Sequence, residues 1–225
     1  MTVVAISQSN YLPWKGYFQL IANADVFVFY DTADFTKRDW RSRNKIIGPG
    51  GFQWMTIPVG SNRGKSIQEV QLPEGQWRSN HLETVRRNYA KAPHIEDVLD
   101  IISPVYNDLS INTLSDFNQS LIRRFCTYLG IQTSFRNASE FNPTGNRVEK
   151  LISICNQLSA TTYLSGPAAK DYISNEFEGT NISLKWMEYG PFEPYDQSIE
   201  PFSDYVSIVD TIAALGPESS LNILT

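Results

Sequence analysis

The first turn of the chain places polar and aromatic side chains directly after an apolar run. Residues 3–6 read VVAI, and residues 7–18 continue as SQSNYLPWKGYF. Gln8 and Asn10 carry amide groups, which both donate and accept hydrogen bonds and can orient a reacting carbonyl and amine. In α/β proteins, ligands bind outside the carboxyl ends of strands, near helix N-termini. We therefore expect a ligand site here. The alternative is an ordinary turn whose aromatic residues join the core.

A second group of residues is strongly basic. Residues 37–45, KRDWRSRNK, hold five cations and one acid, in a chain of net charge −5. This local reversal of charge indicates a phosphate or other anion site, because arginine offers planar paired donors and lysine a mobile charge. A solvated, salt-bridged surface explains the same run equally well. The candidate ligand-binding residues in it are Lys37, Arg38, Arg43, Asn44 and Lys45.

Two further segments are candidates for ligand binding. In residues 163–172, YLSGPAAKDY, an apolar run ends at Ser165-Gly166, and Pro167 opens a helix that includes Lys170. A hydroxyl, a glycine backbone and a lysine at such a place suit a phosphate or carboxylate, although an ordinary helix start explains them as well. The proline-rich segment 190–202 contains Tyr195 and suits either sugar binding or closure of the core.

Candidates for proton transfer are few. Of the two histidines, His81 falls in the helix expected at 79–91, where Arg86 can reach the same pocket. Asp31 directly follows the strand expected at 25–30, where partial burial would raise its pKa. One credible histidine does not suggest zinc, so we expect no metal site. Neither a Gly-x-Ser-x-Gly elbow nor a glycine-rich nucleotide loop occurs in the sequence.

The pattern of apolar residues predicts the elements that position these groups. Strands are expected at 3–6, 25–30, 53–58, 133–135, 161–164 and 182–186, and helices at 13–23, 79–91, 113–130, 145–158 and 204–215. Alternation of strands and helices predicts a Rossmann-like α/β fold with a mostly parallel sheet flanked by helices. We expect one domain, 1–225, whose helical middle, 77–130, forms a lobe of its own.

Composition limits the class of protein. The chain has 225 residues, of which 41% are hydrophobic, enough for a sizeable core. Cys126 and Cys155 fall within apolar helical patterns and are expected to be buried thiols. Neither a signal peptide nor the roughly 18 apolar residues of a membrane span is present in this sequence. These observations predict a cytoplasmic protein.

Several segments of the chain together resemble the WbqC-like family, found among bacterial genes for surface-polysaccharide biosynthesis. The residues that carry the resemblance are Gln8, Asn10 to Trp14, Gly16 to Phe18, Asp25 to Phe29, Lys37, Arg43 to Lys45, Trp54, Pro58, Val59, Tyr163 to Gly166 and Lys170. Members usually begin with His-Gln-Pro-Asn-Tyr, whereas Ser7 and Ser9 flank Gln8 here. The resemblance implies transfer of glycine or another aminoacyl group onto an amino sugar.

We therefore expect an enzyme that forms an amide bond on a nucleotide-linked amino sugar, in O-antigen or capsule biosynthesis. Gln8, Asn10, Asp31 and His81 are the expected catalytic residues, and Tyr11, Trp14 and Tyr17 the expected substrate contacts of the first turn. The remaining substrate contacts would be the basic residues above with Arg86, Ser165, Gly166, Lys170 and Tyr195. No cofactor is firmly expected. The acyl donor would be an aminoacyl-tRNA, a thioester on an acyl carrier or an adenylate made from ATP. The alternative is a non-catalytic module that binds a nucleotide-sugar or glycan.

Overall fold

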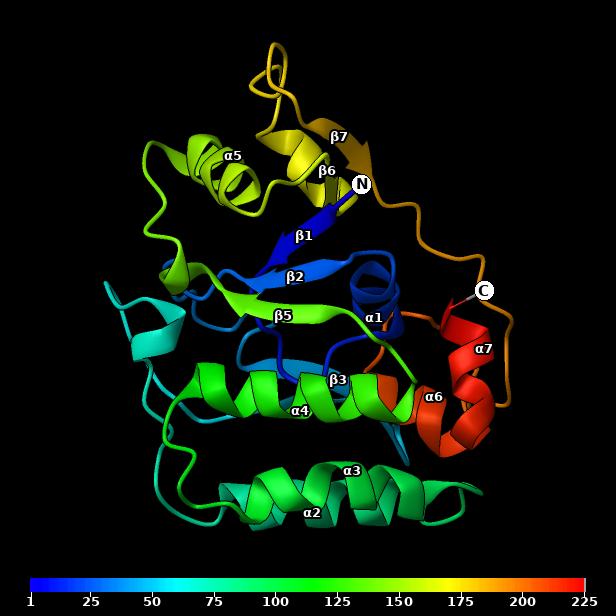
Figure 1. The fold of residues 1–225 in the computed structure, drawn as a ribbon. Helices are drawn as coiled ribbons and strands as arrows, with labels where there is room; N and C mark the ends of the chain where they lie inside the picture. The colour runs from blue at the N-terminus through cyan, green and yellow to red at the C-terminus, as the bar shows by residue number, and fades with distance from the viewer. Residues whose placement is uncertain (225) are drawn as a thin grey trace.

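A parallel sheet lies at the centre of the computed structural model, which describes residues 1–224 (Figure 1). Its five strands are arranged in the order β5-β2-β1-β6-β7. Their bounds are β1 Val3–Ser7, β2 Val26–Phe29, β5 Ser134–Asn137, β6 Thr162–Ser165 and β7 Ser183–Trp186. Every neighbouring pair is parallel. The predicted α/β fold is confirmed, and the strand order matches the first five strands of the Rossmann order 3-2-1-4-5-6.

The sheet has a topological switch point between β1 and β6. From β1 the chain proceeds outward through β2 to β5, and it then returns to the other side of β1 to form β6 and β7. The register pairs Ala5 with both Phe27 and Leu164, so the carboxyl ends of β1, β2 and β6 lie together. Crevices at such points are where open α/β sheets bind ligands.

Helices cover both faces of the sheet, as Figure 1 shows. The helices are α1 Lys15–Ala22, α2 Trp77–Asn88, α3 Ile95–Asn107, α4 Leu114–Tyr128, α5 Arg147–Gln157, α6 Ile208–Leu215 and α7 Ser219–Leu224. Short 3₁₀ helices are η1 Ile67–Glu69, η2 Ala138–Glu140, η3 Pro167–Asp171 and η4 Gly216–Glu218. In Figure 1, α5 lies on the opposite side of the sheet from α4, and α2 and α3 form a further layer beyond α4.

The core divides into two clusters, one on each face of the sheet. One cluster joins Ala5, Phe27 and Phe29 to the apolar sides of α1, α2, α3, α4 and α6. The other joins Val4, Val28 and the apolar side of α5. Successive strand residues point to opposite faces, which explains why neighbours such as Val4 and Ala5 belong to different clusters. The helices of the middle segment, 77–130, thus pack into the same core as one face of the sheet.

A separate hairpin replaces one strand that was predicted for the sheet. The run at 53–58 lies outside the parallel sheet, because β4 (Gly51–Thr56) pairs antiparallel with β3 (Arg43–Gly48). Charged residues concealed β3 in the sequence. Asn44 and Ile46 are buried, and the cations Arg43 and Lys45, which alternate with them along the strand, are half-buried. This alternation is typical of a strand with one buried face.

The longest predicted helix begins and ends close to where the sequence indicates. Thr113 is the N-cap of α4, and its hydroxyl accepts a hydrogen bond from the main-chain N–H of Asp116 at 3.1 Å. Gly130 follows the helix with a φ of +72°, a left-handed conformation that glycine adopts without strain. The sequence analysis gave no bounds for α3, which contains Pro104.

Candidate functional site

A large cavity opens at the carboxyl edge of β1, β2 and β6. Its volume is about 1450 Å³, above the roughly 300–1,000 Å³ of ordinary small-molecule pockets. Of the predicted site residues, Gln8, Asn10, Trp14, Tyr17, Ser165 and Gly166 line it. Tyr30 and Thr32 line it as well, so segments that follow β1, β2 and β6 meet at this edge. The cavity can hold a ligand of the size of a nucleotide-linked sugar.

The cavity floor joins the turn after β1 to the segment before β3. The main-chain N–H of Tyr11 donates to the carbonyl oxygen of Trp40 at 2.8 Å, which places Asn10 beside Arg41. The Tyr17 hydroxyl donates to the carbonyl oxygen of Gln8 at 3.0 Å and fixes the turn against α1. Gln8, Asn10, Tyr17 and Arg41 all line the cavity.

Two polar atoms on this floor are buried without a partner. Asn10 Oδ1 and Arg41 Nε each have no hydrogen-bond partner within residues 1–224. The other end of the Arg41 guanidinium is held, since its Nη1 donates to Asp39 Oδ1 at 3.0 Å. Burial lowers the pKa of the Arg41 guanidinium, and the charge of Asp39 counteracts this effect. Buried polar atoms in proteins are nearly always paired, so this acceptor and this donor are available for a hydrogen bond with a ligand or with water.

Aromatic rings form one wall of the cavity. The Trp14 ring packs edge-on against Tyr189, with centroids 4.9 Å apart, and stacks on Tyr205 at 5.4 Å. Gly166 lies directly against this wall, because a Cβ at this position would lie 3.1 Å from the Tyr189 hydroxyl oxygen. Rings next to amide and hydroxyl groups form a surface on which a sugar or a base can stack.

The far end of the cavity is basic. Arg147 and Lys150, from the first turns of α5, line it together with Tyr30 and Tyr172. The guanidinium carbon of Arg147 lies 3.4 Å from the centroid of the Tyr172 ring. The carboxylates that line the cavity are Asp34 and Asp171.

Asp31 lies below the site rather than in it. Its carboxylate is buried, with 3% of the residue exposed, and is not part of the cavity lining in the described residues. Oδ1 accepts from the main-chain N–H of Ser9 at 2.8 Å, and Oδ2 accepts from the hydroxyl of Ser115 at 2.5 Å. Asp31 therefore ties the turn after β1 to α4.

His81 and Tyr11 are also hydrogen-bonded away from the cavity. The Tyr11 hydroxyl lies 2.7 Å from His81 Nδ1 and is also hydrogen-bonded to the Tyr106 hydroxyl. Burial lowers the pKa of His81 to about 4, although a hydrogen bond to the main chain of Thr56 opposes this. The imidazole is therefore neutral at pH 7. It lies outside the cavity walls formed by residues 1–224.

The basic run 37–45 divides between the cavity and the hairpin. Arg41 alone of its five cations lines the cavity. The guanidinium of Arg43 lies 4.2 Å from the Trp54 ring centroid, and the Lys45 ammonium 5.3 Å from the same centroid. Asn44 points to the other face of β3 and donates to the carbonyl oxygen of Leu12 at 2.7 Å. Lys37 and Arg38 are exposed outside the cavity.

Three remaining predicted contacts also lie outside the cavity walls that the described residues form. Arg86 is exposed on α2. The Lys170 ammonium lies 5.5 Å from the centroid of the Trp186 ring. The Tyr195 hydroxyl donates to Asp210 Oδ2 at 2.7 Å, and burial raises the pKa of this aspartate.

Sequence reasoning missed several residues that line the cavity. Arg41 stood within the basic run and Tyr172 within the segment 163–172, but neither was chosen, and Arg147 and Lys150 were not considered. One signal was available. Arg147 and Lys150 lie three residues apart at the start of a predicted helix that follows the strand at 133–135, so they share a helix face at the expected edge.

The described residues form neither a candidate metal centre nor a membrane-spanning helix. Within residues 1–224, no group of three or more histidine, cysteine, aspartate or glutamate residues is arranged to hold a metal ion. No helix in the same part of the chain is long and apolar enough to cross a membrane.

Fold and cavity together define an α/β protein with a large cavity at the switch point of a parallel sheet. Residues 8–221 match the WbqC-like protein family, so the chain belongs to this family and the resemblance found in its sequence is confirmed. An uncharacterized protein of Mycobacterium tuberculosis is 37% identical over 223 residues, which cover 97% of this chain and 96% of the relative.

Proposed function

We propose that the protein transfers an acyl group, glycyl or another aminoacyl group, to the amine of a nucleotide-linked amino sugar bound in the cavity. The product would serve O-antigen or capsule biosynthesis. The observation that carries this proposal is the pair of unpartnered buried atoms, Asn10 Oδ1 and Arg41 Nε, at the cavity floor.

These two atoms match what amide formation needs. The amine nitrogen attacks the acyl carbon, a C–N bond forms, the bond to the donor's leaving group breaks, and one proton leaves the nitrogen. Asn10 Oδ1 accepts a hydrogen bond from the attacking amine and orients it. Arg41 Nε–H donates to the carbonyl oxygen, which becomes negatively charged in the transition state. A fixed donor in a partly buried site stabilises such charge far better than water does.

A carboxylate of the cavity wall accepts the proton in this scheme. Asp31 and His81 are engaged elsewhere, as their hydrogen bonds show. Asp34 lines the cavity just beyond the end of β2 and is exposed to solvent, so it can receive the proton and release it to water. Positioning of the reactants supplies much of the rate, so a weak base suffices.

A binding module without catalysis is the second candidate. One observation favours it: the buried carboxylate of Asp31 and the neutral imidazole of His81 both lie outside the cavity. The same aromatic and basic walls would then recognise a nucleotide-sugar or a glycan.

The acyl donor remains one of three classes: an aminoacyl-tRNA, a thioester on an acyl carrier, or an adenylate formed from ATP. The two free cysteines suit a reducing cytoplasm, where we place the reaction.

Incorporation of radiolabelled glycine tests the proposal. The purified protein is incubated with a nucleotide-linked sugar that carries a free amine and, in turn, with glycyl-tRNA, a glycyl thioester, or glycine and ATP. We expect label in an acid-stable amide on the sugar. Arg41→Gln should reduce turnover by about 10²-fold or more, as loss of one oxyanion donor does.

Matched variants separate catalysis from binding. Arg63→Gln removes an equivalent charge from an exposed loop outside the cavity lining and should retain full turnover. Asp34→Asn should lower turnover by roughly 10²-fold with little change in substrate affinity. If the nucleotide-sugar binds but no donor gives labelled product, the binding module is the correct interpretation.

A further inference from the structure

The basic end of the cavity holds two cations that no acid neutralises. Arg147 and Lys150 make no ion pair with any residue in the described part of the chain. They lie three residues apart on α5, so their Cβ atoms are about 5–6 Å apart and their charges repel each other. Both side chains face the cavity, as does Leu151 one position further on. Such an arrangement costs stability unless an anion binds between the two charges.

The local acid of the same helix turn is directed elsewhere. Glu149 lies between the two cations in sequence but lines a separate hollow, and its carboxylate accepts from the main-chain N–H of Asn146 at 2.7 Å. Asp171 shares the cavity wall but is not ion-paired with either cation. The charge facing this end of the cavity from α5 is therefore purely positive.

Aromatic rings hold the arginine in place. Its guanidinium lies over the Tyr172 ring, at 3.4 Å from the centroid. It also lies near Tyr30, since burial raises the pKa of that phenol and the charge of Arg147 counteracts the rise. A guanidinium fixed by stacking loses less entropy when it binds an oxyanion, and its planar donors match two phosphate oxygens. The lysine offers a second, mobile charge to a second phosphoryl group.

We propose that Arg147 and Lys150 form a diphosphate-binding subsite. Two adjacent cations match the two phosphoryl groups of a diphosphate ester better than a single carboxylate, which one arginine would neutralise. This inference rests on the proposed function for the rest of the ligand: the nucleotide-linked sugar lies with its diphosphate against α5 and its amino sugar toward Asn10 and Arg41.

Calorimetric titration at constant ionic strength tests the subsite without any acyl transfer. The probes are inorganic pyrophosphate, UDP, UMP and geranyl diphosphate. We expect pyrophosphate and UDP to bind, and UMP to bind at least about tenfold more weakly than UDP, because it lacks one charged group. The double variant Arg147→Gln/Lys150→Gln should weaken binding of UDP by about 10²-fold and that of UMP by less.

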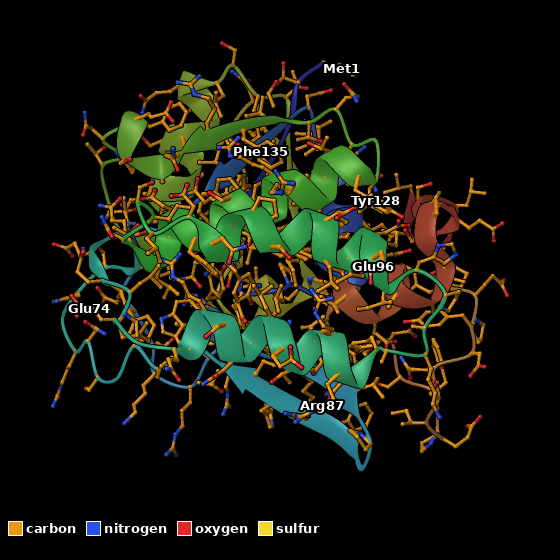
Figure 2. The ribbon with its side chains drawn as sticks, turned by 90° about the horizontal axis from the view of Figure 1, so that it is seen from below. Met1, Glu74, Arg87, Glu96, Tyr128 and Phe135 are labelled. Atoms are coloured by element: carbon orange, nitrogen blue, oxygen red, sulfur yellow. The ribbon has the colours of Figure 1, made fainter. Side chains whose placement is uncertain are left out.

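The control variant removes the same charges elsewhere. Arg87→Gln/Lys91→Gln changes one arginine and one lysine, both exposed. Arg87, labelled in Figure 2, lies near the end of α2, a helix that Figure 1 places across the molecule from α5. This control variant should leave UDP binding within about twofold of the wild type, which excludes an effect of net charge alone. Both double variants change exposed or half-buried side chains, and circular dichroism checks that each is folded.

Three results would overturn the inference: no binding of pyrophosphate or UDP, unchanged UDP affinity in the α5 double variant, or equal affinity for UMP and UDP. Tighter binding of geranyl diphosphate than of UDP would contradict the claim that the diphosphate of the ligand is attached to a nucleotide. Failure of acyl transfer alone does not affect the subsite. Conversely, if the wild type acylates amino sugars but the α5 double variant binds UDP normally, the proposed function stands and the proposed subsite is wrong.

Discussion

At the scale of single residues, the structure separates side chains that hold the site in place from those that face it. Asn10 and Asp31 both carry polar groups near the first turn, yet Asn10 lines the cavity and Asp31 lies buried beneath it. Asp31 binds the main-chain N–H of Ser9 and the hydroxyl of Ser115. These bonds explain its position, because they hold the turn that brings Asn10 to the cavity wall.

Replacement of Asp31 tests this structural role. Asp31→Ala should lower the free energy of unfolding by about 2–4 kcal/mol, because three buried donors, on Ser9, Ser115 and Gln119, lose their acceptor. Urea unfolding measures the change. Asp34→Ala, at an exposed position three residues later, should alter stability by less than about 0.5 kcal/mol. Equal stability of the wild type and Asp31→Ala would contradict the role.

His81 should make stability depend on pH. Its pKa in the folded protein is about 4, compared with an ordinary value of 6.5, because burial disfavours the charged imidazole. Between these values the unfolded chain binds more protons than the folded one, so stability is fully present above pH 6.5 and falls as the pH drops toward 4. From pH 7 to pH 5 the loss due to His81 should be about 2 kcal/mol. Urea unfolding of the wild type and His81→Asn measures it, and an identical pH dependence of both would contradict it.

At the scale of secondary-structure elements, the hairpin positions the first turn. Asn44 of β3 donates to the carbonyl oxygen of Leu12, a residue held at a φ of +43°. Non-glycine residues adopt this left-handed conformation only when the surroundings stabilise it. The buried face of the hairpin therefore holds the first turn in place beside the cavity. Arg43, Lys45 and Trp54 occupy the other face of the hairpin.

Two neighbouring positions of β3 test this division of faces. Asn44→Ala should lower the free energy of unfolding by about 1–3 kcal/mol, because it leaves a buried carbonyl without its donor. Arg43→Ala removes a half-buried side chain from the opposite face and should cost less than about 1 kcal/mol. Thermal or urea unfolding of both variants provides the comparison. A larger loss in Arg43→Ala than in Asn44→Ala would contradict it.

Sequence patterns predicted the sheet better than they predicted the site. Apolar runs located β1, β2 and β6, because buried parallel strands contain little else. The strand-like runs at 133–135 and 182–186 located the two edge strands, β5 and β7, in which exposed and half-buried residues alternate. The hairpin was missed, since alternating charged and buried residues in β3 look like a charge cluster. Arg147 was missed because it lies far from Asn10 in the chain. Its segment follows β5, which reaches the same edge of the sheet by pairing with β2.

At the scale of the whole molecule, the two core clusters separate the cysteines. Cys126 belongs to the cluster shared by α1 and α4, and Cys155 to the cluster under α5. Burial raises the pKa of each thiol to about 12. Neither thiol should react with Ellman's reagent in the native protein at pH 8, and both should react in denaturing urea, since only the thiolate is nucleophilic. Rapid reaction in the native state would show that one cluster opens readily.

The central claim is that a nucleotide-linked sugar binds at the switch point of the sheet, between the floor of Asn10 and Arg41 and the basic end of α5. A crystal structure of the protein with a bound UDP-linked amino sugar tests it most directly. The account predicts the sugar amine within hydrogen-bond distance of Asn10 Oδ1, and the diphosphate in contact with Arg147 and Lys150. Electron density for the ligand on the outer face of the hairpin, against Arg43, Lys45 and Trp54, with an empty cavity, would contradict it.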